Sequence, residues 1–99
     1  EIMNIQNLMA QAQRVQKDLE RANNEIENTV FEGVSGAVKV TISGKHEVKS
    51  VVITDDSVLS DKEMLEDMIL IAVNDGLKKI SKMKEEKMGK YTGGLGGLF

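Results

Sequence analysis

The residues whose types and spacing could do chemistry are two groups of cationic side chains. Arg14, Lys17 and Arg21 are spaced by three and four positions, so a helix would carry them on one face. A second group lies near the C-terminal end of the chain and consists of Lys78, Lys79, Lys82, Lys84, Lys87 and Lys90. Cations repeated along a helix can contact the phosphates of a nucleic acid, because each contact releases a counterion. The pattern suggests phosphate contact without base stacking, since the chain has no ladder of aromatic side chains.

A structural role would explain the same cations. The formal net charge of the chain is −3, which argues against nucleic-acid binding when the chain is taken as a whole. Asp18 and Glu25 follow Arg14 and Arg21 by four positions and could neutralise them on a helix. Lysines near the C-terminal end of a helix would also complement its dipole. The residues alone leave both interpretations open.

No constellation of residues indicates an enzyme. The single histidine, His46, falls in a predicted turn, and the chain has no Gly-x-Ser-x-Gly nucleophile elbow. Asp55 and Asp56 are adjacent, so their side chains would point apart, and no calcium-loop spacing follows them. The run Gly93–Gly97 lacks the Gly-Lys-Ser/Thr of a phosphate-binding loop. The chain also has no cysteine, which excludes a thiolate metal site, and we predict a non-enzymatic protein.

Two long helices must position the cations. A coiled-coil-like seam, with apolar residues at steps of three and four, predicts a helix over Ile5–Glu27. Its members are Ile5, Leu8, Ala12, Val15, Leu19, Ala22 and Ile26, and Met9 widens it. Ser60 and Glu63 match a capping box, which predicts a second helix over residues 61–88 that Gly89 ends. Gly76 inside this helix indicates the close approach of another backbone.

Three short strands are predicted between the helices. Their ranges are Thr29–Glu32, Ala37–Ser43 and Glu47–Thr54, with turns at Gly33–Gly36 and Ser43–His46 and a positive φ at Gly44. Val38, Val40 and Ile42 alternate with polar residues, as in a half-buried strand. Val48 is out of phase with Val51 and Ile53, which predicts a bulge or a change of face near Ser50. Because the strands are close in sequence, we expect an antiparallel meander.

These elements predict one α+β domain of order α-β-β-β-α over residues 1–88, followed by a flexible glycine-rich tail over residues 89–99. Helices of roughly 34 and 42 Å would overhang a sheet only about 14 Å across. A monomer would leave much of the seam in water, so we predict a homodimer. No run approaches the roughly 18 apolar residues of a membrane span, and no secretory signal opens the chain, so we expect a soluble cytoplasmic protein.

Several segments, in this order along the chain, resemble the YbaB/EbfC family of bacterial nucleoid-associated proteins. They are Asn4–Gln13 at the start of the first helix, Gly36–Gly44 in the second strand, Asp61–Asp67 at the start of the second helix, and Ala72–Asp75 within it. The resemblance covers about residues 4–88. The chain departs from the family pattern at two places. Ile53–Asp56 lacks the proline that often follows the third strand of the family, and the first helix has only three cations.

The resemblance implies a tweezers-like homodimer whose paired sheets form the body and whose long helices project. It implies binding to double-stranded DNA with low sequence specificity, a location on the nucleoid in the cytoplasm, no cofactor, and effects on nucleoid organisation and gene expression. Because the family's long terminal helices are implicated in DNA contact, the candidate DNA-binding residues are Arg14, Lys17, Arg21, Lys78, Lys79 and Lys82. The alternative is a helical adaptor that docks a protein partner and binds DNA weakly or not at all. The acidic balance and the continuous seam favour that alternative.

Overall fold

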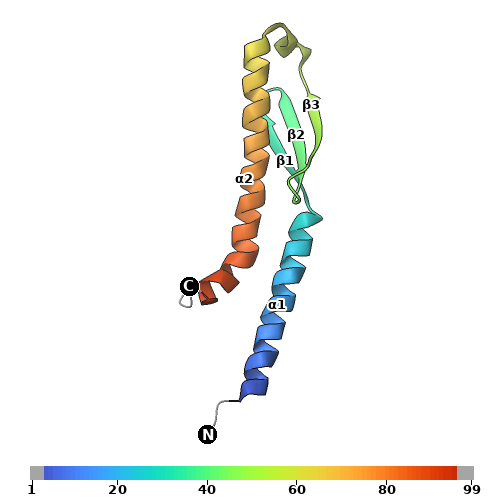
Figure 1. Cartoon of the computed structure of the whole chain (residues 1–99). Helices are drawn as coiled ribbons and strands as arrows, with labels where there is room; N and C mark the ends of the chain where they lie inside the picture. The colour runs from blue at the N-terminus through green and yellow to red at the C-terminus, as the bar shows by residue number, and fades with distance from the viewer. Residues whose placement is uncertain (1–3, 96–99) are drawn as a thin grey trace.

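The computed structural model describes residues 4–95, with side chains described for residues 4–89. The elements follow in the order α1 (Ile5–Glu27), β1 (Val30–Ser35), β2 (Val38–Ser43), β3 (Val48–Ile53), a 3₁₀ helix η1 (Asp56–Ser60) and α2 (Lys62–Leu95) (Figure 1). The predicted α-β-β-β-α fold is therefore confirmed. The molecule is a rod with extents of 75 × 23 × 13 Å, because α1 continues the long axis that α2 and the sheet define.

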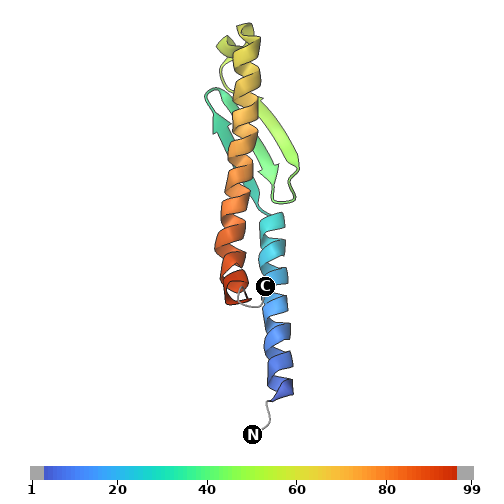
Figure 2. The ribbon, with the colours of Figure 1, turned by 60° about the vertical axis from the view of Figure 1, so that its left-hand side comes forward.

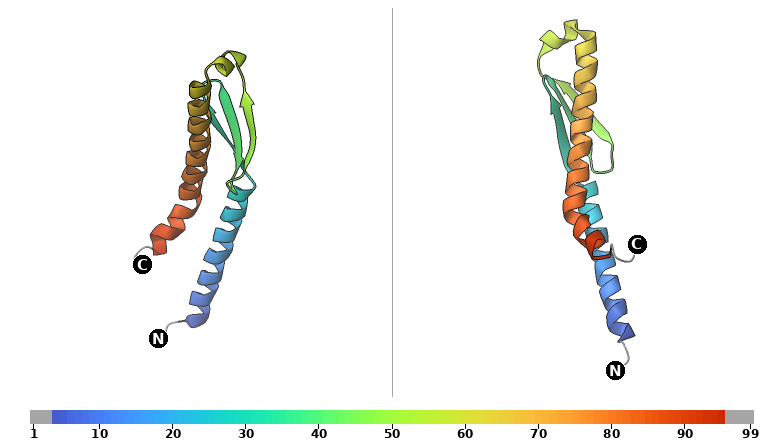
Figure 3. Two further views of the ribbon diagram at one scale, coloured as in Figure 1. Left: turned by 45° about the horizontal axis from the view of Figure 1, so that its top comes forward. Right: turned by 90° about the vertical axis from the view of Figure 1, so that its left-hand side faces the viewer.

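Helix α1 has the predicted bounds. It begins at Asn4, whose side-chain oxygen accepts a hydrogen bond of 3.1 Å from the backbone N–H of Asn7. Only the C-terminal end of its seam is covered: Ile26 is buried, whereas Ile5 is 64% exposed, and Leu8 and Met9 are exposed as well. Figure 3 shows the reason, since the first half of α1 extends past the end of α2.

The sheet is an antiparallel meander of order β1-β2-β3, as predicted. Val38, Val40 and Ile42 alternate along the central strand and are fully buried beneath α2. Helix α2 crosses β1 and β2 and leaves β3 at the side (Figure 2). The core is therefore centred on one face of β1 and β2, and the apolar side chains of β3 lie at its margin.

The predicted bounds of the first strand were wrong. We expected Gly33 in a turn, but β1 continues through Gly33 to Ser35, and Gly36 makes the turn with a φ of 54°. A Cβ atom on Gly33 would lie 1.9 Å from the carbonyl oxygen of Ala72 in α2. Gly33 is needed because a bare backbone lets the helix approach the strand, and the same contact confirms the expected role of Gly76, whose Cβ position lies 3.6 Å from the Gly33 nitrogen.

The β2–β3 pair contains the predicted irregularity. Thr41 pairs with Ser50 and Ile42 pairs with Val48, so Lys49 is an extra residue, and Val48 shares a face with Val51. The predicted positive φ of Gly44 was wrong, because the left-handed residue of this hairpin is His46, with a φ of 67°. A side chain on Gly44 would instead collide with the carbonyl oxygen of Ile26, since a Cβ atom would lie 1.7 Å from it.

Helix α2 differs from its prediction at both ends. Ser60 belongs to η1, and the N-terminal cap is Asp61, whose carboxylate accepts a hydrogen bond of 3.0 Å from the backbone N–H of Met64. The helix does not stop at Gly89 but continues to Leu95. Residues 96–99 of the expected flexible tail lie outside the described residues, and the tail stays a prediction.

Candidate nucleic-acid interface

The cations of α1 form an exposed stripe, as the spacing predicts. Arg14 and Lys17 make no ion pair with any described residue. Arg21 is 80% exposed and has one long contact, 3.9 Å, with the carboxylate of Asp18. The expected neutralising pairs are different in the structure, because Asp18 pairs with Arg21 instead of Arg14, and Glu25 pairs with Lys87 of α2 at 3.1 Å. Arg14 and Lys17 therefore remain available to an external anion.

The candidate cations of α2 divide into two kinds. Lys78 and Lys82 are one turn apart on the face opposite the buried Ile80. They line a shallow hollow whose other lining residues are Asn74, Leu77, Ser81 and Glu85. They make no ion pair with any other described side chain. Each is therefore free to contact a phosphate.

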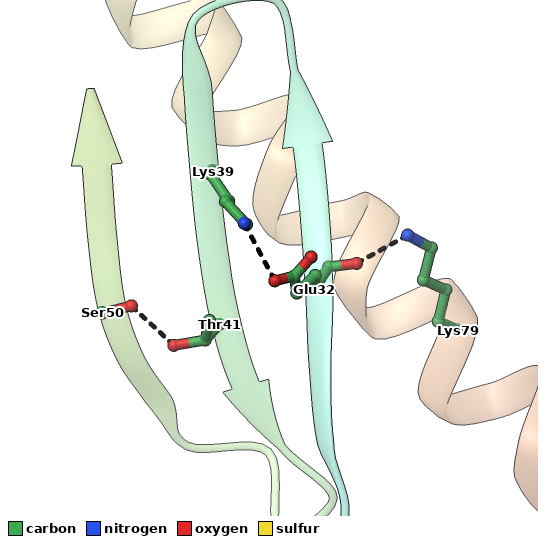
Figure 4. Close-up of polar contacts among 5 residues, drawn as sticks. All are labelled: Glu32, Lys39, Thr41, Ser50 and Lys79. Atoms are coloured by element: carbon green, nitrogen blue, oxygen red, sulfur yellow. Dashed lines mark hydrogen bonds and ion pairs between the residues drawn. The ribbon is translucent and has the colours of Figure 1, made fainter. Parts of the chain in front are cut away.

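Lys79 lies on another face and supports the fold. Its Nζ donates a hydrogen bond of 2.7 Å to the backbone carbonyl of Glu32 (Figure 4). The same Nζ lies 3.4 Å from the carboxylate of Asp75. The same carboxylate accepts a hydrogen bond of 3.0 Å from the backbone N–H of Val34. Asp75 and Lys79 thus satisfy two outward backbone groups of β1, which is an edge strand.

The charge of Asp75 is stabilised by this arrangement. The backbone N–H of Val34 lowers the pKa of the Asp75 carboxyl below its ordinary value of 3.8, burial partly opposes this shift, and the charges of Lys79 and Lys78 add to the lowering. Asp75 therefore stays ionised at neutral pH, and Lys79 keeps its partner.

The outer face of the sheet carries polar pairs that are separate from both cation groups. Lys39 pairs with Glu32 at 3.0 Å, and the hydroxyls of Thr41 and Ser50 share a hydrogen bond of 2.6 Å (Figure 4). These pairs join neighbouring strands, as cross-strand neighbours do in an antiparallel sheet. Because Lys39 is paired with Glu32, it is not counted among the free cations.

The two groups of free cations lie far apart along the rod. The Glu25–Lys87 ion pair joins α1 to α2 and marks one position along the long axis of the rod. At about 1.5 Å per residue along the helix axes, Arg14 lies about 16 Å from this position toward the N-terminal end of α1. Lys78 lies about 14 Å from it in the opposite direction along the rod. The cations of one subunit therefore span about 30 Å, close to one turn of B-form DNA, which is about 34–36 Å.

Sequence reasoning missed one cluster of cations. Lys84 was assigned to the general lysine group of the second helix, and Lys45 was treated only as part of a turn. The fold brings them to one hollow beside His46 at the foot of the β2–β3 hairpin. No short motif predicts this cluster, because the hairpin and α2 are about 40 residues apart and only the tertiary fold joins them.

Among residues 4–95, no three His, Asp or Glu side chains gather where they could hold a metal ion. No helix in the same range is long and apolar enough to cross a membrane.

The sequence of the chain is similar to those of known DNA-binding and nucleoid-associated proteins. Residues 2–95 match the YbaB/EbfC DNA-binding family. The chain is 46% identical over 99 residues to a nucleoid-associated protein of Ruminiclostridium cellulolyticum, covering 96% of this chain and 85% of that protein. It is 40% identical to one of Chloroflexus aurantiacus, covering 98% of this chain and all of that protein.

A solved structure shares the fold. The crystal structure of an uncharacterized protein from Helicobacter pylori superposes with a TM-score of 0.69 at 26% sequence identity. The match covers 86% of this chain and 92% of that one. The fold of most of this chain is thus found in a solved structure.

Proposed function

The chain belongs to the YbaB/EbfC DNA-binding family, and from this premise we propose that it is a non-enzymatic homodimer that binds double-stranded DNA on the nucleoid with low sequence specificity. The observation that carries the proposal is the set of exposed cations without ion pairs among the described residues of both long helices: Arg14, Lys17, Lys78 and Lys82. Such cations contact phosphates, which are the same in every sequence. Nucleoid organisation and gene expression are the processes that this binding would affect.

The six candidate residues have different roles in this proposal. Arg14, Lys17, Lys78 and Lys82 are the direct phosphate contacts, and Arg21 joins them because its contact with Asp18 is long and exposed. Lys79 is a positioning residue, since its ammonium group is already bonded to β1 and to Asp75. Substitution of Lys79 would then change the stability of the fold more than the affinity for DNA.

The homodimer is inferred from apolar side chains that one subunit leaves uncovered. Val48 and Val51 point toward the same side of the sheet as the buried residues of β2, yet they are 50% and 48% exposed. Leu70 and Leu77 lie seven residues apart, so they share one side of α2; Leu70 is 59% exposed, and Leu77 is only partly buried against the core. We call these four residues the open flank, and a second copy of the chain would cover it.

The position of Lys84 indicates that the members of the open flank lie on one side of the molecule. Lys84 follows Leu77 by a further seven residues, so it lies on the same side of α2, and it reaches the β2–β3 hairpin. The exposed side chains of β3 and of α2 are therefore neighbours. A two-fold axis beside them would bury both sets at once and would leave the ends of the helices free to project.

Salt-dependent DNA binding tests the proposal. We expect gel shifts of random-sequence duplexes to weaken steeply between 50 and 200 mM salt, by roughly 10³–10⁵-fold for six to ten phosphate contacts. Arg14→Glu with Lys17→Glu should weaken binding evenly across sequences and should leave the dimer intact. Undetectable binding of the unmodified protein at 50 mM salt would refute DNA binding.

The exposed seam of α1 favours a second candidate function, which is a helical adaptor for a protein partner. Ile5, Leu8 and Met9 have no cover within the described residues of one subunit. A stoichiometric protein recovered from nuclease-treated lysate, together with weak DNA binding, would support this candidate. Loss of that protein in an Ile5→Gln, Leu8→Gln variant would identify the seam as the docking surface.

A further inference from the structure

A small polar hollow lies where three elements meet. The end of α1, the β2–β3 hairpin and the middle of α2 enclose about 250 Å³, several times the roughly 30 Å³ that a water molecule occupies in the liquid. Figure 1 shows the hairpin reaching down to the end of α1 at this place. The buried side chains of Ile26 and Ile80 form part of its lining, and polar side chains form the rest. A group the size of a phosphate fits a hollow of this size.

The hollow is rich in unused hydrogen-bond donors. Lys45, His46 and Lys84 line it, and their side chains make no hydrogen bond or ion pair with any described residue. The one acidic side chain, Glu27, accepts a hydrogen bond of 2.9 Å from the amide of Asn23. Two lysines outweigh this single carboxylate, so the hollow favours an anion.

The hairpin that presents Lys45 and His46 is held firmly in place. The backbone N–H of Gly44 donates to the carbonyl of Thr29 at 3.0 Å, and the N–H of His46 donates to the carbonyl of Ser43 at 2.8 Å. Gly44 is buried, and its lack of a side chain lets the hairpin lie against the end of α1. The backbone that carries Lys45 and His46 is therefore fixed beside the hollow.

The conformation of His46 also points to a ligand. Its φ of 67° is left-handed, which glycine adopts more easily than histidine does. A strained residue is often kept where its side chain contributes to a site. Glycine at position 46 would make the same turn without the strain, but it would remove the imidazole from the hollow.

We propose that this hollow, with Lys45, His46 and Lys84 as donors, holds one backbone phosphate of bound duplex DNA. The proposal rests on the proposed function and adds a site on the hairpin, between the long helices. Lys84 lies three residues, or about 4.5 Å, from the level of Lys87, and therefore between the two helical groups of cations. It also continues the open flank, so the two hollows of a dimer would lie on the sides of the subunits that face each other.

The salt dependence of DNA binding tests the site. Each dimer has two hollows, so Lys45→Ala with Lys84→Ala should remove two phosphate contacts. The slope of log K against log salt should then become less steep by about 1.8. The affinity at 0.1 M salt should fall by about 60-fold. The charge-matched control is Lys39→Ala with Lys62→Ala, on the outer face and at the other end of α2, which should leave the slope nearly unchanged. A slope in the Lys45, Lys84 variant equal to that of the control overturns the proposal.

The variant His46→Gly separates a binding role from a folding role. It should fold at least as stably as the unmodified protein, because the strain at position 46 is relieved, and it should bind DNA more weakly. Unchanged affinity in a folded His46→Gly protein would remove the imidazole from the site.

A titration with inorganic phosphate distinguishes failure of this site from failure of the proposed function. Backbone amide signals of residues 44–47 should shift in the unmodified protein and should stay fixed in the Lys45→Ala, Lys84→Ala protein. If DNA does not bind but these signals shift, the proposed function fails and the anion site stands. If DNA binds with an unchanged slope and the signals do not shift, the proposed function stands and the site is overturned.

Discussion

The stripe on α1 makes a quantitative prediction that can be tested without a crystal of the complex. Arg14 and Lys17 have no internal partner among the described residues, so replacing both with glutamine should remove two phosphate contacts from each subunit. A dimer would lose four contacts, and its salt slope should fall by about 3.6. Glutamine is a good helix former, so α1 should keep its structure.

The same slope fixes how the loss of affinity depends on salt. Four lost contacts correspond to about 4,000-fold weaker binding at 0.1 M salt and to about 300-fold at 0.2 M. Fluorescence anisotropy with a labelled random duplex of about 30 base pairs would measure both values. Circular dichroism and light scattering would establish that the helix content and the mass of the dimer are unchanged.

Two results would refute this reasoning. If the slope of the Arg14→Gln, Lys17→Gln protein equals that of the unmodified protein, then α1 does not contact phosphates. If affinity falls by the same factor at every salt concentration, the lost interaction is not the release of counterions. The charge-matched Lys39→Ala, Lys62→Ala protein provides the reference for nonspecific effects of net charge.

Other regions of the molecule give four further predictions. Lys79→Met should lower the free energy of unfolding by about 1 kcal/mol, seen in urea melts, and should leave the salt slope of DNA binding unchanged. Because the pKa of Asp75 is lowered by folding, its contribution to stability is present above the unfolded pKa of about 3.9 and is lost as pH falls through the lower folded pKa. The urea midpoints of the unmodified protein and of Asp75→Asn should therefore differ most at neutral pH and converge below about pH 4; a constant difference would contradict this. Gly33→Ala should destabilise the fold by about 3 kcal/mol or more, because the new Cβ would collide with the backbone of α2, and a thermal melt within 2 °C of the unmodified protein would disprove the close contact. Val51→Lys on the open flank should convert the dimer to a species near 10.9 kDa in light scattering, whereas a mass near 10.9 kDa for the unmodified protein would remove the dimer itself.

The order and type of the elements could be read from the sequence because local patterns determine them. The heptad seam of α1 and the alternation of Val38, Val40 and Ile42 are each complete within one element, and both predictions are confirmed. The bulge near Ser50 was also visible, because Val48 is out of phase with Val51. These features depend on periodicity, which a single chain displays without any tertiary contact.

The misplaced boundaries have a common physical cause, which is contact with a distant element. Gly33 looked like a turn residue, but it is small because α2 packs against it. Gly44 looked like a left-handed glycine, but it is small because α1 ends against it. In both cases a local interpretation of glycine was natural, and the true constraint came from residues far away in the chain.

The exposure of the candidate cations could be predicted from their spacing, but their bonding partners could not. Arg14, Lys17, Lys78 and Lys82 are exposed, as their spacing indicates, whereas Lys79 is bonded to β1 although its neighbours are free. A helical wheel cannot distinguish Lys79 from Lys78, because the distinction depends on where the edge strand lies. The cluster of Lys45 with Lys84 was invisible for the same reason.

The bonds of Asp75 and Lys79 to β1 have a consequence for how many copies of the chain can join. The sheet has two edges, and at the β1 edge two outward groups, the N–H of Val34 and the C=O of Glu32, already have partners on α2, which hinders the addition of another strand there. No described side chain of α2 bonds to the backbone of the β3 edge in the same way. In the proposed homodimer the two subunits would meet on the β3 side, around a two-fold axis, and the protected β1 edges would face outward. Growth into ribbons or fibres would thereby be disfavoured.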